Sequence, residues 1–319
     1  MKIKLKDLLM EGPDGSKMPK KVAAELDKLI DSIPSIPITE KWGQMDEKGM
    51  KSAERVDFEN RLKSFLKGAG PIDRLENFIA KVNGEVDAKP SNSISEIFNR
   101  IVVMRTINNI VTGFSPSGAG FIFEALTAAI MNGRQVVEKE DGQLGIADVE
   151  MLTGEPFSMK LLSKQTDLKG SKLNLEAAVK RHGAVTYIIM LRETPTSGKI
   201  EFYSGVIDKA NLIYFKESQP KKDQFKIAAT PSNLKSKLKN FQLLGTLNVE
   251  TEDIRNAVKD SLIQLQQNVQ PIYSALKDFT LNLHMYFGAD KEVQRKSAAA
   301  KAKQSSKNLD TQAQTTIKV

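Results

Sequence analysis

The stretch "SKLNLEAAVKRHGAVTYIIMLRE", residues 171–193, predicts a helix followed directly by a buried strand. Its first half has apolar residues at helical spacing and stops at Gly183, which is typical of a helix end. His182 precedes that glycine, where a cation suits the helix dipole. The second half contains "VTYIIML", a nearly continuous apolar run that is typical of a central strand covered on both faces. The sequence therefore predicts a core that combines helices with a sheet.

The residues before this stretch extend the same pattern. A helix is expected over 117–132, and short β-like runs follow at 134–140, 145–152 and 156–162. Further strands are expected at 199–207 and 210–217. The order of helix, three strands, helix and strand predicts an α+β core of about 120 residues, with a central mixed sheet flanked by helices.

Both flanks of this core are predicted to be helical. Apolar residues at intervals of three and four indicate helices at 20–33, 51–67, 71–83 and 94–111, and again over 230–287, where Pro271 should kink or split the helix. The tail is rich in Ala, Lys, Ser, Gln and Thr, so frayed helix and then disorder are expected there. The predicted organisation is a helical N-terminal region at 1–112, the core at 113–229, a helical C-terminal region at 230–288 and a basic tail at 289–319.

Composition excludes several kinds of site. The 319 residues include no cysteine and two histidines, so disulfides, thiolate metal sites and three-histidine zinc sites are impossible. No signal peptide and no apolar run long enough to span a bilayer is visible, so a soluble, cytoplasmic protein is expected. The net charge of +8 favours a polyanionic partner.

The stretch "GIADVEMLTGEPFSMKLLS", residues 145–163, holds the candidate site. Asp148 and Glu150 are two residues apart on a predicted strand, so their side chains share a face. "TGEP" is a turn by composition, and Lys160 lies on the strand after it. A hairpin would bring the two acids and the lysine together, either as a solvated face or as a metal-dependent phosphodiesterase site.

A third acid, Glu124, lies within the apolar helical stretch "GFIFEALTAAIMNG", residues 120–133. A charged residue there is either at the helix edge or directed at a group that needs it. Carboxylate oxygens suit Mg²⁺, with Mn²⁺ as the alternative ion, and the carbonyl of Met159 is a further candidate ligand. A bound ion would polarise a phosphate, and a nearby lysine would orient or deprotonate the attacking water.

A helix with Glu, a strand with Asp, a turn and a strand ending in x-x-Lys together resemble the PD-(D/E)XK superfamily, which has the restriction-endonuclease-like fold. The resemblance covers about residues 115–215. It implies that Asp148 binds the metal, that Lys160 is the catalytic lysine and that Glu124 matches the helix glutamate that many members place beside the metal. Asp148, Glu150 and Glu124 are the expected metal ligands, and Lys160, Asp148 and Glu124 the expected catalytic residues.

The chain departs from the family at Ser158, which stands where "EXK" or "DXK" has its acid. Either Glu150 or Glu124 substitutes for that acid, or the site has lost its chemistry. The region after the lysine, "SKQTDLKGSKLNL", offers a phosphate-contacting loop at a helix N-terminus. The candidate DNA-binding residues there are Lys164, Gln165, Lys169, Ser171 and Lys172. The alternative is a solvated loop in which Ser171 caps the next helix.

The expected function is Mg²⁺-dependent endonucleolytic cleavage of DNA, with hydrolysis by a metal-activated water. The competing interpretation is a catalytically inactive nuclease-fold protein with an interaction or structural role, such as a component of a phage virion or of DNA packaging. DNA is the expected partner, and a homodimer or a phage protein is the alternative. The expected location is the cytoplasm, or the host cytoplasm or the virion for a phage-encoded chain.

Overall fold

The structure, a computed structural model, describes residues 28, 32, 36, 42, 51–62, 66, 68–84, 94–113, 116–136, 147–151, 153–164, 166–194, 196–215, 223–228 and 241–316. The chain divides into two compact units. One comprises Pro34–Val86 and Val102–Ile254, and the other comprises Met1–Ile33, Asp87–Ile101 and Arg255–Val319. The first of these, which contains the sheet, is called the sheet unit below.

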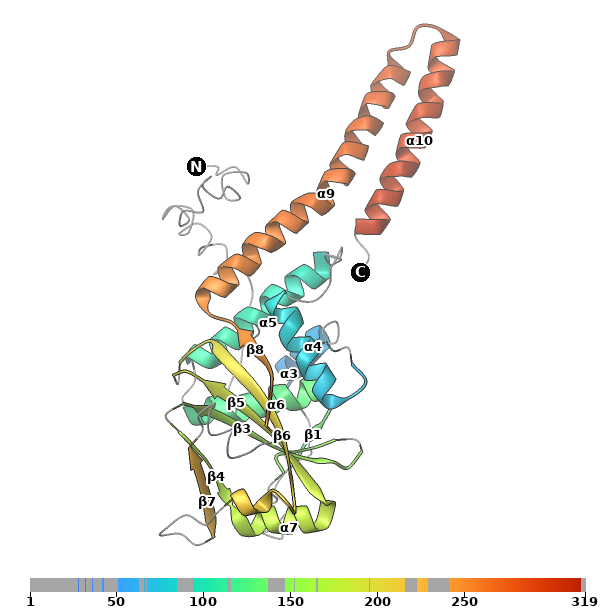
Figure 1. The fold of residues 1–319 in the computed structure, drawn as a ribbon. Coiled ribbons are helices and arrows are strands. Elements are labelled where there is room, and N and C mark those ends of the chain that lie inside the picture. Colours follow the sequence, from blue (N-terminus) through green and yellow to red (C-terminus); the bar gives the residue numbers. More distant parts are fainter. Residues whose placement is uncertain are drawn as a thin grey trace. The chain divides into compact units, whose positions relative to one another are not determined.

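A mixed sheet of six strands forms the centre of the sheet unit (Figure 1). The strands lie in the order β1, β2, β3, β5, β6, β8, and only β3 and β5 are parallel neighbours. Their bounds are β1 Arg134–Gln135, β2 Val149–Glu150, β3 Pro156–Ser163, β5 Ala184–Arg192, β6 Lys199–Asp208 and β8 Gln242–Asn248. The predicted α+β class with a mixed sheet flanked by helices is confirmed.

Helix α7, Lys172–His182, connects the two parallel strands as the sequence predicts. It begins at Ser171, whose side chain accepts a hydrogen bond from the Asn174 amide, and it ends before Gly183, which has a φ of 82°. A positive φ at that position strongly favours glycine. The helix–strand boundary read from the sequence at Gly183 is therefore confirmed.

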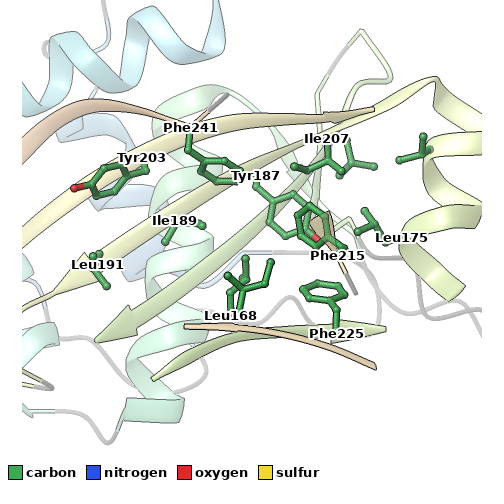
Figure 2. Close-up of a cluster of buried hydrophobic side chains, with 13 residues drawn as sticks. Leu168, Leu175, Tyr187, Ile189, Leu191, Tyr203, Ile207, Phe215, Phe225 and Phe241 are labelled. Carbon is green, nitrogen blue, oxygen red and sulfur yellow. The ribbon is translucent and has the colours of Figure 1, made fainter. Parts of the chain in front are cut away.

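One face of the sheet carries an aromatic-rich core (Figure 2). Alternate residues of β5, among them Tyr187 and Ile189, pack there against Leu175 of α7. A two-stranded ribbon of β4, Asp167–Ser171, and β7, Gln224–Ala228, closes this core with Leu168, Phe225 and Ile227. Burying these side chains anchors α7 and the ribbon to the sheet.

The opposite face is covered by helix α6, Pro116–Met131. The Thr127 hydroxyl on α6 contacts the Met190 sulfur of β5 at 3.3 Å. Helix α4, Pro71–Asn83, packs against α6 and β8, and helix α3, Ala53–Leu62, also contacts α6. Helix α5, Ile94–Gly113, precedes α6 in the chain. The predicted helices at 71–83, 94–111 and 117–132 are confirmed, and α3 confirms the middle of the one at 51–67.

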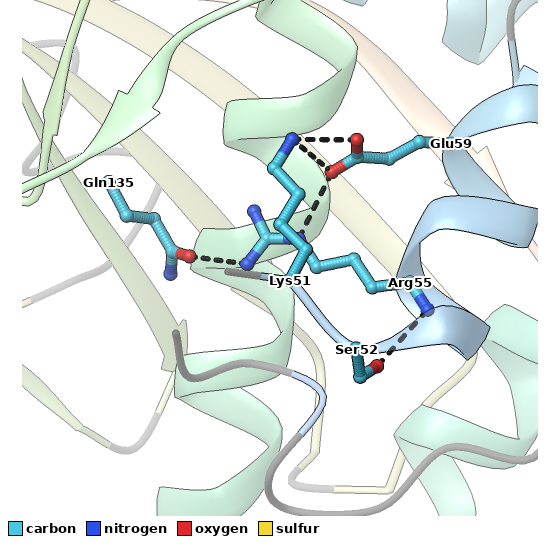
Figure 3. Close-up of polar contacts among 5 residues, drawn as sticks. All are labelled: Lys51, Ser52, Arg55, Glu59 and Gln135. Atoms are coloured by element: carbon cyan, nitrogen blue, oxygen red, sulfur yellow. Dashed lines mark hydrogen bonds and ion pairs between the residues drawn. The ribbon is translucent and has the colours of Figure 1, made fainter. Parts of the chain in front are cut away.

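Arg55 of α3 is a buried charge whose polar atoms have partners (Figure 3). Its guanidinium donates to Glu59 at 3.0 Å and to Gln135 at 2.6 Å. It also lies 5.8 Å from the centre of the Trp42 ring. Pairing of this kind is what makes a buried arginine tolerable.

Several sequence predictions in this unit are wrong. Residues 210–217 contain a short 3-10 helix, η2, Leu212–Tyr214, in place of the expected strand. Residues 167–171 form β4 where a loop was expected after Lys160, and β8 lies where a helical region was expected from residue 230 onward. The predicted helix at 20–33 and the helical start at 231–240 lie largely outside the described residues.

The second unit contains most of helix α9, Thr251–Phe287, and all of α10, Glu292–Thr316 (Figure 1). Helix α9 continues through Pro271, so of the two expected effects, a kink or a split, the split does not occur. Helix α10 replaces the disorder expected for the tail, and small side chains, Ala298 and Ala302, are buried on it. Among the described helices of both units, none is long and apolar enough to cross a membrane.

Candidate active site

Asp148 is the residue on which the polar contacts of the candidate site converge. Its Oδ2 atom accepts hydrogen bonds from the Lys160 ammonium at 2.8 Å, the Met159 amide at 2.7 Å and the Ser158 hydroxyl at 3.1 Å. The Asp148 and Lys160 side chains are 24% and 29% exposed, so solvent reaches the ion pair only partly. Such a pair is screened less than a surface salt bridge.

This geometry arises at the point where the pairing between β2 and β3 ends. The register joins Val149 to Phe157 and Glu150 to Pro156, and the Asp148 amide donates to the Phe157 carbonyl at 2.9 Å. From Ser158 onward, β3 has no partner residue in β2. The Asp148 carboxylate takes the Met159 amide there, because a buried amide without a strand partner needs another acceptor.

Ser158 links the Asp148 cluster to Tyr187 of the aromatic-rich core. It is fully buried, and its register partner on β5 is Tyr187. Burial raises the pKa of the Tyr187 hydroxyl, and a hydrogen bond with Ser158 acts in the opposite direction. Tyr187, Ser158 and Asp148 therefore form a connected chain of hydrogen-bonding groups that fixes the carboxylate.

Glu124 of α6 is the second acid of the cluster. Burial and the neighbouring Asp148 charge raise the pKa of its carboxyl to about 7, against the smaller opposing effect of Lys160. A carboxyl near neutrality can exchange a proton or bind a cation at physiological pH. The structure thus brings Glu124, Asp148 and Lys160 into one electrostatic neighbourhood, as the sequence predicts.

Glu150, the third expected metal ligand, lies on β2 next to Pro156 in register. It is not among the charges that shift the pKa of Glu124. Within the described ranges, no group of three or more His, Cys, Asp or Glu side chains is arranged to hold a metal ion. Of the three expected ligands, Glu124 and Asp148 are therefore the two acids close enough for the charge of one to shift the pKa of the other.

Three of the five predicted DNA-contacting residues have partners within the sheet unit. Lys164 forms an ion pair with Glu193 at 2.9 Å, and Lys172 lies 3.7 Å from Glu176. Ser171 caps α7, which is the role that the solvated-loop alternative gave it. Lys169 is exposed on β4, and Gln165 lies outside the described residues.

Sequence reasoning identified Ser158 only as the place of a missing acid, and it did not identify Tyr187 at all. A signal for Tyr187 was present, because it is the only residue with a phenolic hydroxyl in the apolar run 185–191. Buried tyrosine hydroxyls usually have a hydrogen-bond partner. Nothing in the sequence shows that this partner is Ser158, because that requires the parallel register of β3 and β5.

Comparison of the chain with protein-family models, with curated proteins and with solved structures gives no match. The function of the site must therefore be argued from its geometry.

Proposed function

We propose that this protein is a Mg²⁺-dependent nuclease of the restriction-endonuclease-like fold that hydrolyses phosphodiester bonds in DNA at the Asp148 cluster. The observation that carries the proposal is the convergence of Lys160 on Asp148 at 2.8 Å beside Glu124, whose carboxyl has a raised pKa. The order α6, β1, β2, β3, β4, α7, β5 supports it, because apart from the short strand β4 this is the order expected from the sequence resemblance.

The donor chemistry at the cluster fits a hard divalent cation. Two carboxylates lie close enough for one charge to raise the pKa of the other, and a cation between them would relieve that repulsion. Asp148 and Glu124 would hold the ion, with the Met159 carbonyl as a further oxygen ligand. Bound Mg²⁺ supplies Lewis-acid polarisation of the phosphate and a more acidic water.

The side chains of the cluster have separate tasks in this proposal. Lys160 is partly exposed and reaches the Asp148 carboxylate, so it can orient the attacking water and offset negative charge that develops on the phosphate. Ser158 and the Met159 amide hold the carboxylate in position through their hydrogen bonds. Glu124, whose pKa is raised by burial and by Asp148 before an ion binds, would give up its proton when it takes its place as the second carboxylate ligand of the cation.

One observation favours a second candidate, an inactive nuclease-fold protein with an interaction role. Ser158 stands where the family has an acid, it is fully buried, and it donates to the same oxygen that Lys160 contacts. A site in which Lys160 simply neutralises Asp148 would give a stable structural ion pair without catalysis. The two candidates make opposite predictions for cleavage.

Nicking of supercoiled plasmid by the purified full chain with Mg²⁺ separates them. Asp148→Asn and Lys160→Met should each reduce nicking by about a hundredfold or more, because each removes a charged group that acts in the transition state. Asp223→Asn and Lys209→Met are matched controls on exposed turns and should retain full activity. Circular dichroism checks that all four variants fold. Nicking that is absent from the wild type, or unchanged in both site variants, would overturn the proposal.

A further inference from the structure

At one end of the sheet, two buried side chains have polar atoms without a hydrogen-bond partner among the described residues. Arg192 is 3% exposed and Ser163 is 4% exposed. Within the described part of the chain, Nε and Nη1 of Arg192 and Oγ of Ser163 have no partner. This contrasts with Arg55, which is equally buried and is paired with Glu59 and Gln135 (Figure 3).

These two residues are the last residues of β5 and β3, and they are register partners in the parallel pair. Because register partners project to the same face of a sheet, both side chains lie on one face at the carboxyl ends of the strands. The Lys164 amide donates to the Arg192 carbonyl at 3.0 Å, which keeps the two strand ends together. In open α/β sheets ligands bind outside the carboxyl ends of parallel strands, and β3 and β5 are the one parallel pair of this described sheet.

Helix α6 covers this face and points its positive end toward the same edge. Arg192 shares its face of β5 with Met190, which the Thr127 hydroxyl contacts. Gly133, directly after α6, packs close to Val149, which pairs with Phe157 near the start of β3. Helix α6 therefore runs antiparallel to β3 and β5, and its N-terminal end is directed to the carboxyl edge. A helix N-terminus attracts negative charge.

The charge of the Arg192 guanidinium also has no counter-charge among the described residues. Burial lowers the pKa of its guanidinium, and no carboxylate among the described residues acts on it in the opposite direction. A buried guanidinium without a counter-charge is strongly unfavourable, so an anion at this place would be stabilising. Ser163 adds a hydroxyl donor beside it, and the two side chains are not bonded to each other.

We propose that Arg192 and Ser163 bind a phosphate oxyanion at the carboxyl ends of β3 and β5. The planar fork of the guanidinium matches two phosphate oxygens, and the Ser163 hydroxyl donates to an oxygen of the same group. The site is distinct from the Asp148 cluster, because Lys160 lies three residues earlier on β3, about 10 Å away along the strand. It does not depend on cleavage.

Thermal unfolding of the full chain in EDTA tests the site without any metal-dependent activity. Sodium phosphate should raise the unfolding midpoint of the wild type more than sodium chloride of equal ionic strength, because a ligand of the folded state stabilises it by mass action. Arg192→Met should lose this phosphate-specific rise, and Arg192→Lys should retain only part of it. Arg181→Met, at an exposed position at the end of α7, should behave as the wild type.

The absence of a phosphate-specific rise in the wild type, or an equal rise in Arg192→Met, would overturn the proposal. If Arg192→Met does not fold, Ser163→Ala decides, because it removes only a hydroxyl without a partner among the described residues. That variant should bind phosphate less tightly, and unchanged binding would overturn the proposal.

The source of the phosphate is determined by fluorescence anisotropy with a short single-stranded oligonucleotide, with and without a 5′-phosphate. If the site takes a nucleic-acid phosphate, Arg192→Met should weaken the affinity roughly tenfold relative to Arg181→Met. If it takes free phosphate, the oligonucleotide affinities stay equal while the phosphate-specific thermal shift is still lost.

Discussion

Asp148 is the centre of the polar cluster in the sheet unit, because one of its carboxylate oxygens accepts hydrogen bonds from Ser158, Met159 and Lys160. These three donors hold the Asp148 carboxylate in one orientation. Glu124, in contrast, is held toward its protonated form by burial and by Asp148. Glu124 is therefore the acid of this cluster whose pKa is raised to about 7.

The carboxyl of Glu124 should make stability fall as pH rises from about 4.5 to about 7. Its folded-state pKa is raised above the unfolded value, so the folded state binds the proton more tightly and loses that advantage as the proton dissociates. Relative to Glu124→Gln, the wild type should lose up to about 3 kcal/mol across this range and no more above it. Urea unfolding of both proteins at several pH values measures this. If the free energy of unfolding depends on pH in the same way in the wild type and in Glu124→Gln, the raised pKa of Glu124 is wrong.

Replacing the buried Ser158 with aspartate should make the stability of the protein depend on metal. Ser158→Asp places a second carboxylate beside Asp148 at a fully buried position, so the free energy of unfolding should fall by about 2–4 kcal/mol without metal. Saturating Mg²⁺ should restore part of that loss, and it should stabilise the variant more than the wild type. Denaturant unfolding with Mg²⁺ or with EDTA measures both effects. An equal Mg²⁺ response in the two proteins would show that no ion binds between these positions.

At the scale of elements, the β4–β7 ribbon encloses the core against which α7 packs. Gly170 on β4 is the register partner of Phe225 on β7, and a Cβ atom at Gly170 would lie 2.7 Å from the Phe225 ring. The ring therefore packs where a larger residue would project. This contact holds the ribbon over the aromatic core shown in Figure 2.

Gly170→Ala and Gly120→Ala should have opposite effects on stability. The first creates a clash with Phe225 and should cost about 1–3 kcal/mol. The second adds a methyl group to α6 with nothing within 4 Å, and it should stabilise by about 0.5–1 kcal/mol through helix propensity. Thermal and urea unfolding of both variants test this. A neutral or stabilising Gly170→Ala would show that the ribbon does not pack as described.

The elements that the sequence predicted correctly are those with a strong apolar signal. Helices α6 and α7 and strands β3 and β5 carry such patterns, and so the α+β class and the pairing of Asp148 with Lys160 followed. Strands β4 and β7 escaped prediction because they are short and alternate with exposed lysines, Lys169 and Lys226. The contact of Ser158 with Tyr187 and the placement of Arg192 beside Ser163 both follow from the register of β3 and β5. Spacing along the chain does not specify that register.

At the scale of the whole molecule, positive charge is the property most relevant to a nucleic-acid partner. The chain carries a net charge of +8, and residues 289–319 contribute seven basic and three acidic residues to it. Helix α10, Glu292–Thr316, presents most of these charges as an ordered helix, with Lys301, Lys303 and Lys307 exposed. Lysines on an ordered helix can neutralise phosphates along a duplex.

Deleting residues 289–319 should weaken DNA binding and make it less dependent on salt. The slope of log K against log salt becomes shallower by about 0.9 for each phosphate that the shortened chain no longer neutralises, so a decrease of at least about 1 is expected. The Asp148 cluster lies in the sheet unit, so the nicking rate at saturating DNA should remain within about twofold of the full chain. Anisotropy of a labelled duplex at several NaCl concentrations measures the slope. An unchanged slope would exclude α10 from the DNA interface.

Binding of Mn²⁺, followed by electron paramagnetic resonance without DNA, tests most directly whether the Asp148 cluster is a metal centre. The proposed function predicts that the wild type binds Mn²⁺ and that Mg²⁺ competes for the site. Asp148→Asn should weaken binding by at least about tenfold, because it replaces a charged ligand of a hard cation. Asp223→Asn should bind as the wild type does. Equal Mn²⁺ affinity in the wild type and Asp148→Asn would show that Asp148 and Lys160 form only a structural ion pair.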